Sequence, residues 1–294
     1  MSHPRPVATD ESSLSRMLEI FDVEPDGDFR FTGVSDGGGR RVVDGSQLLA
    51  QAIVACSKTF PNHTARSAHA VFLRVVDDER PLQFNVDVVH EGRTFAGAVV
   101  SIHQSGPRCA SVTVLMDVEQ PDVIRHGTAK PPVGSPVEAI PCPMPMEGRE
   151  LRLGGVRDPD DPDEFGPPVL DAWLRYSTIP PEPALAKALI AHFTGHLSIS
   201  TTLRGHRGIG TSMAHDSLST GVIAISVTFH EPVVWDGWLL YHHESSHVGS
   251  GMSFVRGQVF TEEGDLLASY SQDGMIRAFT LDASDRAKPI SRRL

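Results

Sequence analysis

The stretch Asp44-Gly-Ser-Gln-Leu-Leu-Ala-Gln-Ala-Ile-Val-Ala-Cys56 decides the fold of the first half of this 294-residue chain. The apolar residues that recur at helical spacing are Leu48, Leu49, Ala52, Ile53 and Cys56. Residues at this spacing share one face of a helix. Asp44 stands at the N-cap position, with Gln47 three residues further on. The stretch therefore predicts a helix that begins after Asp44 and buries one apolar face.

Four extended runs follow this helix, at residues 69–76, 82–89, 94–102 and 109–116. They are rich in valine, alanine, phenylalanine and isoleucine, which is typical of β-strands. Glycine-containing turns separate the later runs, as in Glu91-Gly-Arg93. The first half is therefore predicted to be a helix followed by an antiparallel meander.

The second half repeats this order of elements. Leu185, Leu189, Phe193 and Leu197 recur every four residues behind a proline-rich entrance, which predicts a second helix. Strand-like runs follow at 221–230, 238–245, 253–261 and 266–275. A repeated helix and meander implies an α+β fold in which each antiparallel sheet wraps its own helix. The two sheets can join edge to edge into one extended sheet, which is the arrangement called the double hotdog.

A proline-rich connection separates the two halves. Fourteen of the 22 prolines fall between Pro121 and Pro183, together with the acidic run from Asp158 to Glu164. Proline lacks a backbone donor, so this region is expected to be a long connection with one or two strands inside it. The predicted domains are an N-terminal hotdog at 1–120, the connection at 121–168 and a C-terminal hotdog at 169–294.

Composition excludes several functional classes. The formal charge of −11 gives no basic patch for nucleic acid. No apolar run reaches membrane-spanning length, and the first residues do not resemble a signal peptide. The three cysteines lie far apart in the sequence, which suits reduced thiols in the cytoplasm.

Several motifs resemble the type II acyl-CoA thioesterases. They include Gly45–Ala52 and Pro81–Asp87 in the first half, and Phe229-His-Glu-Pro232, Trp238-Leu-Leu-Tyr241 and Gln272-Asp-Gly274 in the second. The resemblance implies hydrolysis of acyl-CoA to a free fatty acid and CoA by direct water attack. It also implies a role in fatty acid metabolism, no cofactor besides the CoA of the substrate, and a homo-oligomer.

The catalytic trio of that family consists of Asp, Ser or Thr, and Gln, which together hold and activate a water molecule. By position, Gln272 matches the glutamine of the family. Gly195 stands at the aspartate and Val222 at the hydroxyl residue, and neither side chain can hold water. The nearest substitute hydroxyls are Ser226 and Thr228, because residues two apart on a strand share a face.

Substitute bases are His196 and the pair His215-Asp216. The predicted catalytic residues are therefore Gln272, Ser226 and His196. Gln272 can instead be a structural residue that satisfies backbone groups. Because Gly195 and Val222 replace two of the trio, the alternative function is a non-hydrolytic protein that binds acyl-CoA. Enoyl-CoA hydration is a third possibility on the same fold, without a recognisable hydratase motif here.

The remaining histidines and arginines give weaker signals. His192 and His196 are one helical turn apart, but no third ligand accompanies them, so no metal site is expected. His243 and His247 fall on one side of a strand, where a solvated face is expected. The arginines that contact the CoA phosphates stay open among Arg74, Arg93 and Arg256.

Overall fold

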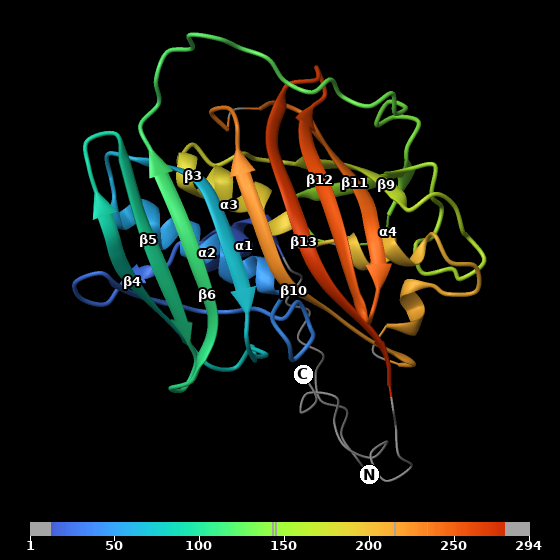
Figure 1. The fold of residues 1–294 in the computed structure, drawn as a ribbon, viewed down its shortest axis with the longest axis horizontal. Helices are drawn as coiled ribbons and strands as arrows, with labels where there is room; N and C mark the ends of the chain where they lie inside the picture. The colour runs from blue at the N-terminus through green and yellow to red at the C-terminus, as the bar shows by residue number, and fades with distance from the viewer. Residues whose placement is uncertain (1–12, 143, 145, 215, 234, 280–294) are drawn as a thin grey trace.

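One antiparallel sheet of thirteen strands runs through the protein, and the helices cover one of its faces (Figure 1). The structure is a computed structural model that describes residues 13–279, except 143, 145, 215 and 234. The helices are α1 (Leu14–Phe21), α2 (Gly45–Thr59), α3 (Pro183–Phe193) and α4 (Ser198–Leu203), with a 3-10 turn at Thr211–Met213. The strands are β1 (Glu24–Pro25), β2 (Arg30–Gly33), β3 (Thr64–Phe72), β4 (Leu82–Glu91), β5 (Phe95–His103), β6 (Arg108–Asp117), β7 (Ile140–Pro141), β8 (Arg149–Gly154), β9 (Val169–Tyr176), β10 (Leu218–Phe229), β11 (Trp238–Gly249), β12 (Met252–Thr261) and β13 (Leu266–Ala278).

The order of the strands confirms the double hotdog. It reads β1-β2-β4-β5-β6-β3-β10-β13-β12-β11-β9-β8-β7, so the two halves mirror each other across β3 and β10. Each half contains a three-stranded meander, and the strand that precedes it, β3 or β10, pairs with the last strand of that meander instead of the first, which corrects the predicted simple meander. These two strands pair from Ala224 opposite Val71 to Thr228 opposite Ser67. The edge-to-edge joint of the two sheets was therefore predicted correctly. It removes the two strand edges that the halves would otherwise expose.

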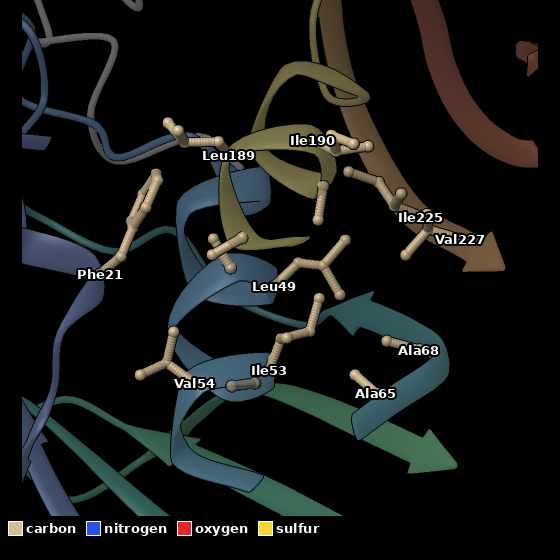
Figure 2. Packing of buried hydrophobic residues seen from close by; sticks show 14 of the residues in the cluster. Phe21, Leu49, Ile53, Val54, Ala65, Ala68, Leu189, Ile190, Ile225 and Val227 are labelled. Carbon is tan, nitrogen blue, oxygen red and sulfur yellow. The ribbon is translucent and has the colours of Figure 1, made fainter. Parts of the chain in front are cut away.

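The core lies between the sheet and helices α2 and α3. Figure 2 shows Leu49 and Ile53 of α2 directed toward the labelled residues of β10 and β3. Leu189 and Ile190 of α3 lie beside them in the same cluster. Burial of such side chains contributes about 1.5–3 kcal/mol each, which makes this layer the main source of stability.

Helix α2 is buried on every side, whereas the sequence predicted a single buried face. All residues from Ser46 to Cys56 are buried, because α1 and α3 pack on the sides that the sheet leaves free. The polar Gln51 is buried completely, and its side-chain amide donates to the carbonyl oxygens of Ile20 at 2.9 Å and Val34 at 2.8 Å. The two bonds of the amide nitrogen explain a polar residue at this position, although the amide oxygen has no partner among the described residues.

Helices α2 and α3 run antiparallel. The start of α2 lies against the residues that follow α3, since Ser46 contacts Gly195. The start of α3 lies against the residues that follow α2. There the buried Lys187 donates to Thr64 Oγ1 at 2.7 Å and to the Ala65 carbonyl at 2.6 Å, and burial lowers its pKa to about 8.

The proline-rich connection crosses one end of the sheet before it joins the second half (Figure 1). It contains the two short strands β7 and β8, and β8 pairs with β9 at the edge of the second sheet. The connection therefore contributes to the second hotdog, as the expected strands inside it suggest. Elements α1, β1 and β2, which extend the first half, had no clear sequence signal.

One expectation about the second sheet is wrong. His243 does not lie on a solvated face but is fully buried, and its Nδ1 donates to the Leu170 carbonyl at 3.0 Å. Burial lowers its pKa to about 4, so the ring is neutral at pH 7. His247 is exposed, because a register shift between Ser245 and His247 ends the simple alternation. Within the described residues, no helix is both long and apolar enough to span a membrane.

Candidate active site

A cavity of about 1610 Å³ opens where the two halves meet. Its wall combines the start of α2, the loop between α3 and α4, and the first half of β10. The apolar part of this wall includes Val43, Leu48, Phe72, Val76, Met144 and Ile225. A cavity of this size and polarity suits an extended organic ligand with an apolar end.

The start of α2 forms one side of the cavity. Asp44 is the N-cap residue, as the sequence predicts, but its carboxylate makes no capping bond and instead accepts from Arg40 at 2.7 Å. A Cβ atom at Gly45 would lie 2.7 Å from the ring of Phe72, so only glycine lets this ring pack on the helix start. The first backbone N–H groups of a helix have no partner within it, and they carry the positive end of its dipole.

His196 lies in the loop after α3 and lines the cavity. Its Nδ1 donates to the His192 carbonyl at 3.2 Å, because a carbonyl oxygen can only accept. The neutral ring therefore keeps its lone pair on Nε2, which lies 4.0 Å from Asp44 Oδ2. Burial lowers the pKa of His196, with the Asp44 carboxylate opposing this effect, while 12% of the side chain stays exposed. The result is a neutral base that water can reach.

Gly195 is held in contact with Ser46 of α2. A Cβ atom at position 195 would lie 2.4 Å from both Cβ and Oγ of Ser46. The Ser46 side chain thus fills the space in which a residue at 195 would begin. Ser46 is 2% exposed, and its hydroxyl has no hydrogen-bond partner among the described residues.

A β-bulge decides which residues of β10 face the helices. Val222 pairs with Gly274 and Ile225 pairs with Gln272, so Ile223 is an extra residue that reverses the alternation. Val222 lines the cavity. Ser226 points to the opposite face of the sheet, where its Oγ lies 2.7 Å from Nδ1 of His69. The structure therefore does not bring Ser226 to the site, and the reason is the bulge.

Gln272 lies on the helix-covered face of β13, beside Ile225 and Val255 of the neighbouring strands. It is 1% exposed, and neither its amide nitrogen nor its amide oxygen has a hydrogen-bond partner among the described residues. Ile225 lines the cavity, whereas Gln272 lies behind this wall. A buried amide without partners is unusual in a purely structural role.

The other predicted candidates lie elsewhere. Thr228 shares the outer face with Ser226, since each pairs with alternate residues of β3 and β13. Asp216 is exposed and does not line the cavity, and His215 lies outside the described residues. Within those residues, no group of three or more potential metal ligands gathers, and His192 packs its ring 5.2 Å from that of Phe21.

Four arginines line the cavity, which is unexpected in an acidic protein. They are Arg40, Arg41, Arg74 and Arg277. Arg40 pairs with Asp44, whereas the side chains of the other three form no ion pair with a described residue. Arg256 instead binds Glu244 through both carboxylate oxygens on the exposed face. Asp158 and Asp160 also line the cavity and partly offset the positive charge.

Two helix-wrapping halves, fused in one chain with a cavity at their joint, define a double hotdog protein. The acyl-CoA thioesterase C-terminal domain matches residues 124–276, and the acyl-CoA thioesterase N-terminal domain matches residues 36–116. The chain belongs to the acyl-CoA thioesterase family. The resemblance noted in the sequence is therefore confirmed, as is the assignment to a family of thioester hydrolases.

Relatives of this family match most of the chain. Acyl-CoA thioesterase 2 of Haemophilus influenzae is 26% identical over 284 residues, which cover 90% of this chain and 98% of the relative. Human acyl-coenzyme A thioesterase 8 is 23% identical, with 79% and 80% covered. A solved tesB protein of Mycobacterium avium subspecies paratuberculosis has the same fold, with a TM-score of 0.76, 22% identity, and 90% and 100% covered.

Sequence reasoning missed Ser46. It lies 149 positions before Gly195 in the numbering, and nothing in the linear sequence signals their contact. The internal repeat was the available signal, because antiparallel packing of the two helices brings the start of one to the end of the other. Register information, which one sequence does not contain, was needed to find the pair.

Proposed function

We propose that this chain hydrolyses acyl-CoA thioesters by direct attack of water, with His196 as the general base. The observation that carries the proposal is the position of His196 in the cavity wall, with its Nδ1 hydrogen committed to the His192 carbonyl. Such a ring has one free lone pair, and its lowered pKa keeps that lone pair unprotonated at neutral pH. The histidine thus supplies the proton acceptor that Gly195 lacks.

The proposed reaction balances without a covalent enzyme intermediate. Water attacks the thioester carbonyl carbon while His196 Nε2 accepts a proton from it. The tetrahedral intermediate then breaks its C–S bond, and the thiolate of CoA receives the proton from the imidazolium. During its brief protonated state, the ring lies near the Asp44 carboxylate, whose charge stabilises the cation.

Charge on the carbonyl oxygen builds up during attack. The start of α2 lines the cavity, and its free N–H groups and positive dipole end suit a developing oxyanion. Gln272 is included in the proposed site because its buried amide has no other described partner. Its neighbour Ile225 lines the cavity, so a small shift of this wall gives the amide access.

The CoA end of the substrate is proposed to contact the arginines of the cavity. Arg74 is the member of the three earlier candidates that lines the cavity, and Arg277 lines it as well. Guanidinium groups bind phosphate oxygens through paired hydrogen bonds. The apolar wall formed by Leu48, Phe72 and Val76 then remains for the acyl chain.

Thiol release from acyl-CoAs of increasing chain length tests the proposal directly. Hydrolysis is expected for at least one chain length, with a loss of activity at acid pH as His196 becomes protonated. His196→Gln should lower kcat by about 10²–10⁴ and remove this acid limb. Phe193 packs against His196 with stacked rings, so unfolding by urea must first show that the variant is folded.

Gly195 and Val222 replace two members of the family trio. The alternative function is therefore a protein that binds acyl-CoA without hydrolysing it. Isothermal titration with a non-hydrolysable thioether analogue measures binding independently of turnover. Binding without any thiol release over background would reject the hydrolase and support the binding protein.

We further propose the cellular setting that the sequence suggests: a cytoplasmic homo-oligomer that acts in fatty acid metabolism. The three cysteines are free thiols, and two of them are buried, which suits a reducing compartment. The outer face of the sheet exposes Phe95 and Leu115 on the neighbouring strands β5 and β6, a surface that supports contact between subunits. Light scattering of the purified protein measures the oligomer directly.

A further inference from the structure

The contact between Ser46 and Gly195 suggests a replacement for the missing aspartate. The family motif places a carboxylate at position 195, and here the Ser46 side chain occupies the start of that space. Its Oγ lies 2.4 Å from the point where a Cβ at 195 would stand. The hydroxyl therefore lies close to where the carboxylate side chain of a relative would leave the backbone.

The Ser46 hydroxyl has no partner within the described protein. The residue is 2% exposed, yet it belongs to the cavity wall. Its Oγ is itself buried, and buried hydroxyl groups are nearly always hydrogen-bonded, so a small shift of this wall that brings a water molecule to Oγ would supply the missing partner. Ser46 also lies in the first turn of the 15-residue helix α2, where the dipole favours a partner that carries negative charge.

His196 lies in the same part of the cavity wall as Ser46. It follows Gly195 directly, and its Nε2 is near Asp44, which precedes Ser46 by two residues. The two groups do not bond to each other, since Ser46 Oγ has no partner among the described residues. A water molecule between them could donate one hydrogen to His196 Nε2 and accept one from the Ser46 hydroxyl, or donate its second hydrogen to Oγ.

We propose that Ser46 is a catalytic residue that holds the attacking water against His196 Nε2. This inference rests on the proposed hydrolysis and adds the hydroxyl group that Val222 cannot supply. The oxygen of the water forms the new C–O bond, its proton moves to His196, and the C–S bond breaks to release CoA. Ser46 keeps its own proton and forms no bond to the acyl group.

Two other hydroxyl groups near the cavity fit the role of holding the attacking water less well. Ser198 begins α4, is buried and also lacks a described partner, but the atoms nearest to a Cβ at position 195 belong to Ser46 and His192, not to Ser198. Thr220 faces the cavity from β10, two residues before Val222. Ser46 alone combines an unpartnered hydroxyl, the start of a long helix and contact with Gly195.

The test compares Ser46→Ala with Ser57→Ala, a serine on the same helix whose hydroxyl donates to the Ile53 carbonyl at 3.0 Å. Ser46→Ala keeps the Cβ atom that packs on Gly195, so the fold should persist. We expect kcat to fall by about 10–10³, the range for one positioning group, with KM nearly unchanged. The acid limb due to His196 should remain, and Ser57→Ala should match the wild type.

Three results would overturn the assignment. One is a kcat of Ser46→Ala within threefold of an active wild type. The second is a larger loss in Ser198→Ala than in Ser46→Ala, which would put the water at α4. The third is a mass increase by one acyl group on Ser46 after rapid acid quenching, which would make the serine a nucleophile. An inactive wild type would instead reject the proposed hydrolysis itself, and the inference with it.

Discussion

Replacing Gly195 with alanine perturbs a close contact between the two halves. The new Cβ would lie 2.4 Å from two atoms of Ser46, more than 1 Å inside the usual carbon contact of about 3.5–4.0 Å. The backbone at Gly195 does not have the positive φ that favours glycine, so the cost comes from crowding alone. Overpacking of this kind destabilises by about 1–3 kcal/mol.

Ser46→Gly removes both crowding atoms. Alone it should cost about 1 kcal/mol or less, because glycine is unfavourable in helices but the first turn is the most tolerant part. In the double variant the added methyl group fills the space left by Ser46. We therefore expect the double variant to be more stable than the sum of the single effects by about 1–2 kcal/mol.

Urea unfolding of the four proteins in this cycle measures the coupling. Gly221→Ala is the matched control, since a Cβ at Gly221 would meet no atom within 4 Å and its φ is also not positive. It should change the free energy of unfolding little. Additive effects, or a Gly195→Ala variant as stable as Gly221→Ala, would refute the close contact on which the site depends.

Three further predictions concern single groups. Arg74→Ala should raise KM for acyl-CoA about tenfold with little change in kcat, while Arg256→Ala, whose side chain binds Glu244, should leave steady-state kinetics unchanged. The pKa of His243 falls from 6.5 to about 4 on folding, so the unfolded chain binds the proton of this histidine at a higher pH than the folded chain does. The free energy of unfolding should therefore drop by up to about 3 kcal/mol between pH 6.5 and pH 4. Urea titrations of His243→Asn should show a smaller drop. Gln51→Leu leaves one buried and one partly buried carbonyl without their donor and should lower the free energy of unfolding by about 1–3 kcal/mol, measured by the same method. A change under about 0.5 kcal/mol would contradict the role of this amide.

The fold was predictable because its signals are local and repeated. The helix after Asp44 and the strands that follow it depend on spacing within a few residues, and these elements form. The first strand was predicted too late in the chain, at 69–76, whereas β3 spans Thr64–Phe72. The second half repeats the order, so a single misjudged strand would not have changed the architecture. The burial of α2 on all sides was not predictable, because α1 gave no signal of its own.

The site was less predictable because it depends on register. One extra residue at Ile223 reverses the alternation of β10, which sends Ser226 to the outer face although it lies an even number of positions after Val222. The contact of Ser46 with Gly195 depends on the relative position of helices α2 and α3 along their axes. His196 needed no such information, since it follows Gly195 directly and reaches the cavity wall from the same loop.

The mirrored order of strands gives the chain two helix ends that are equivalent in topology but different in chemistry. At the start of α2, Ser46 and His196 line the cavity. At the opposite junction, the amine of Lys187 donates hydrogen bonds to Thr64 and Ala65. Two identical subunits would have had two equal junctions and would bind two ligands. Because both halves belong to one chain, their sequences can differ. The expected stoichiometry is therefore one CoA ester per chain, with the second junction closed by the hydrogen bonds of Lys187.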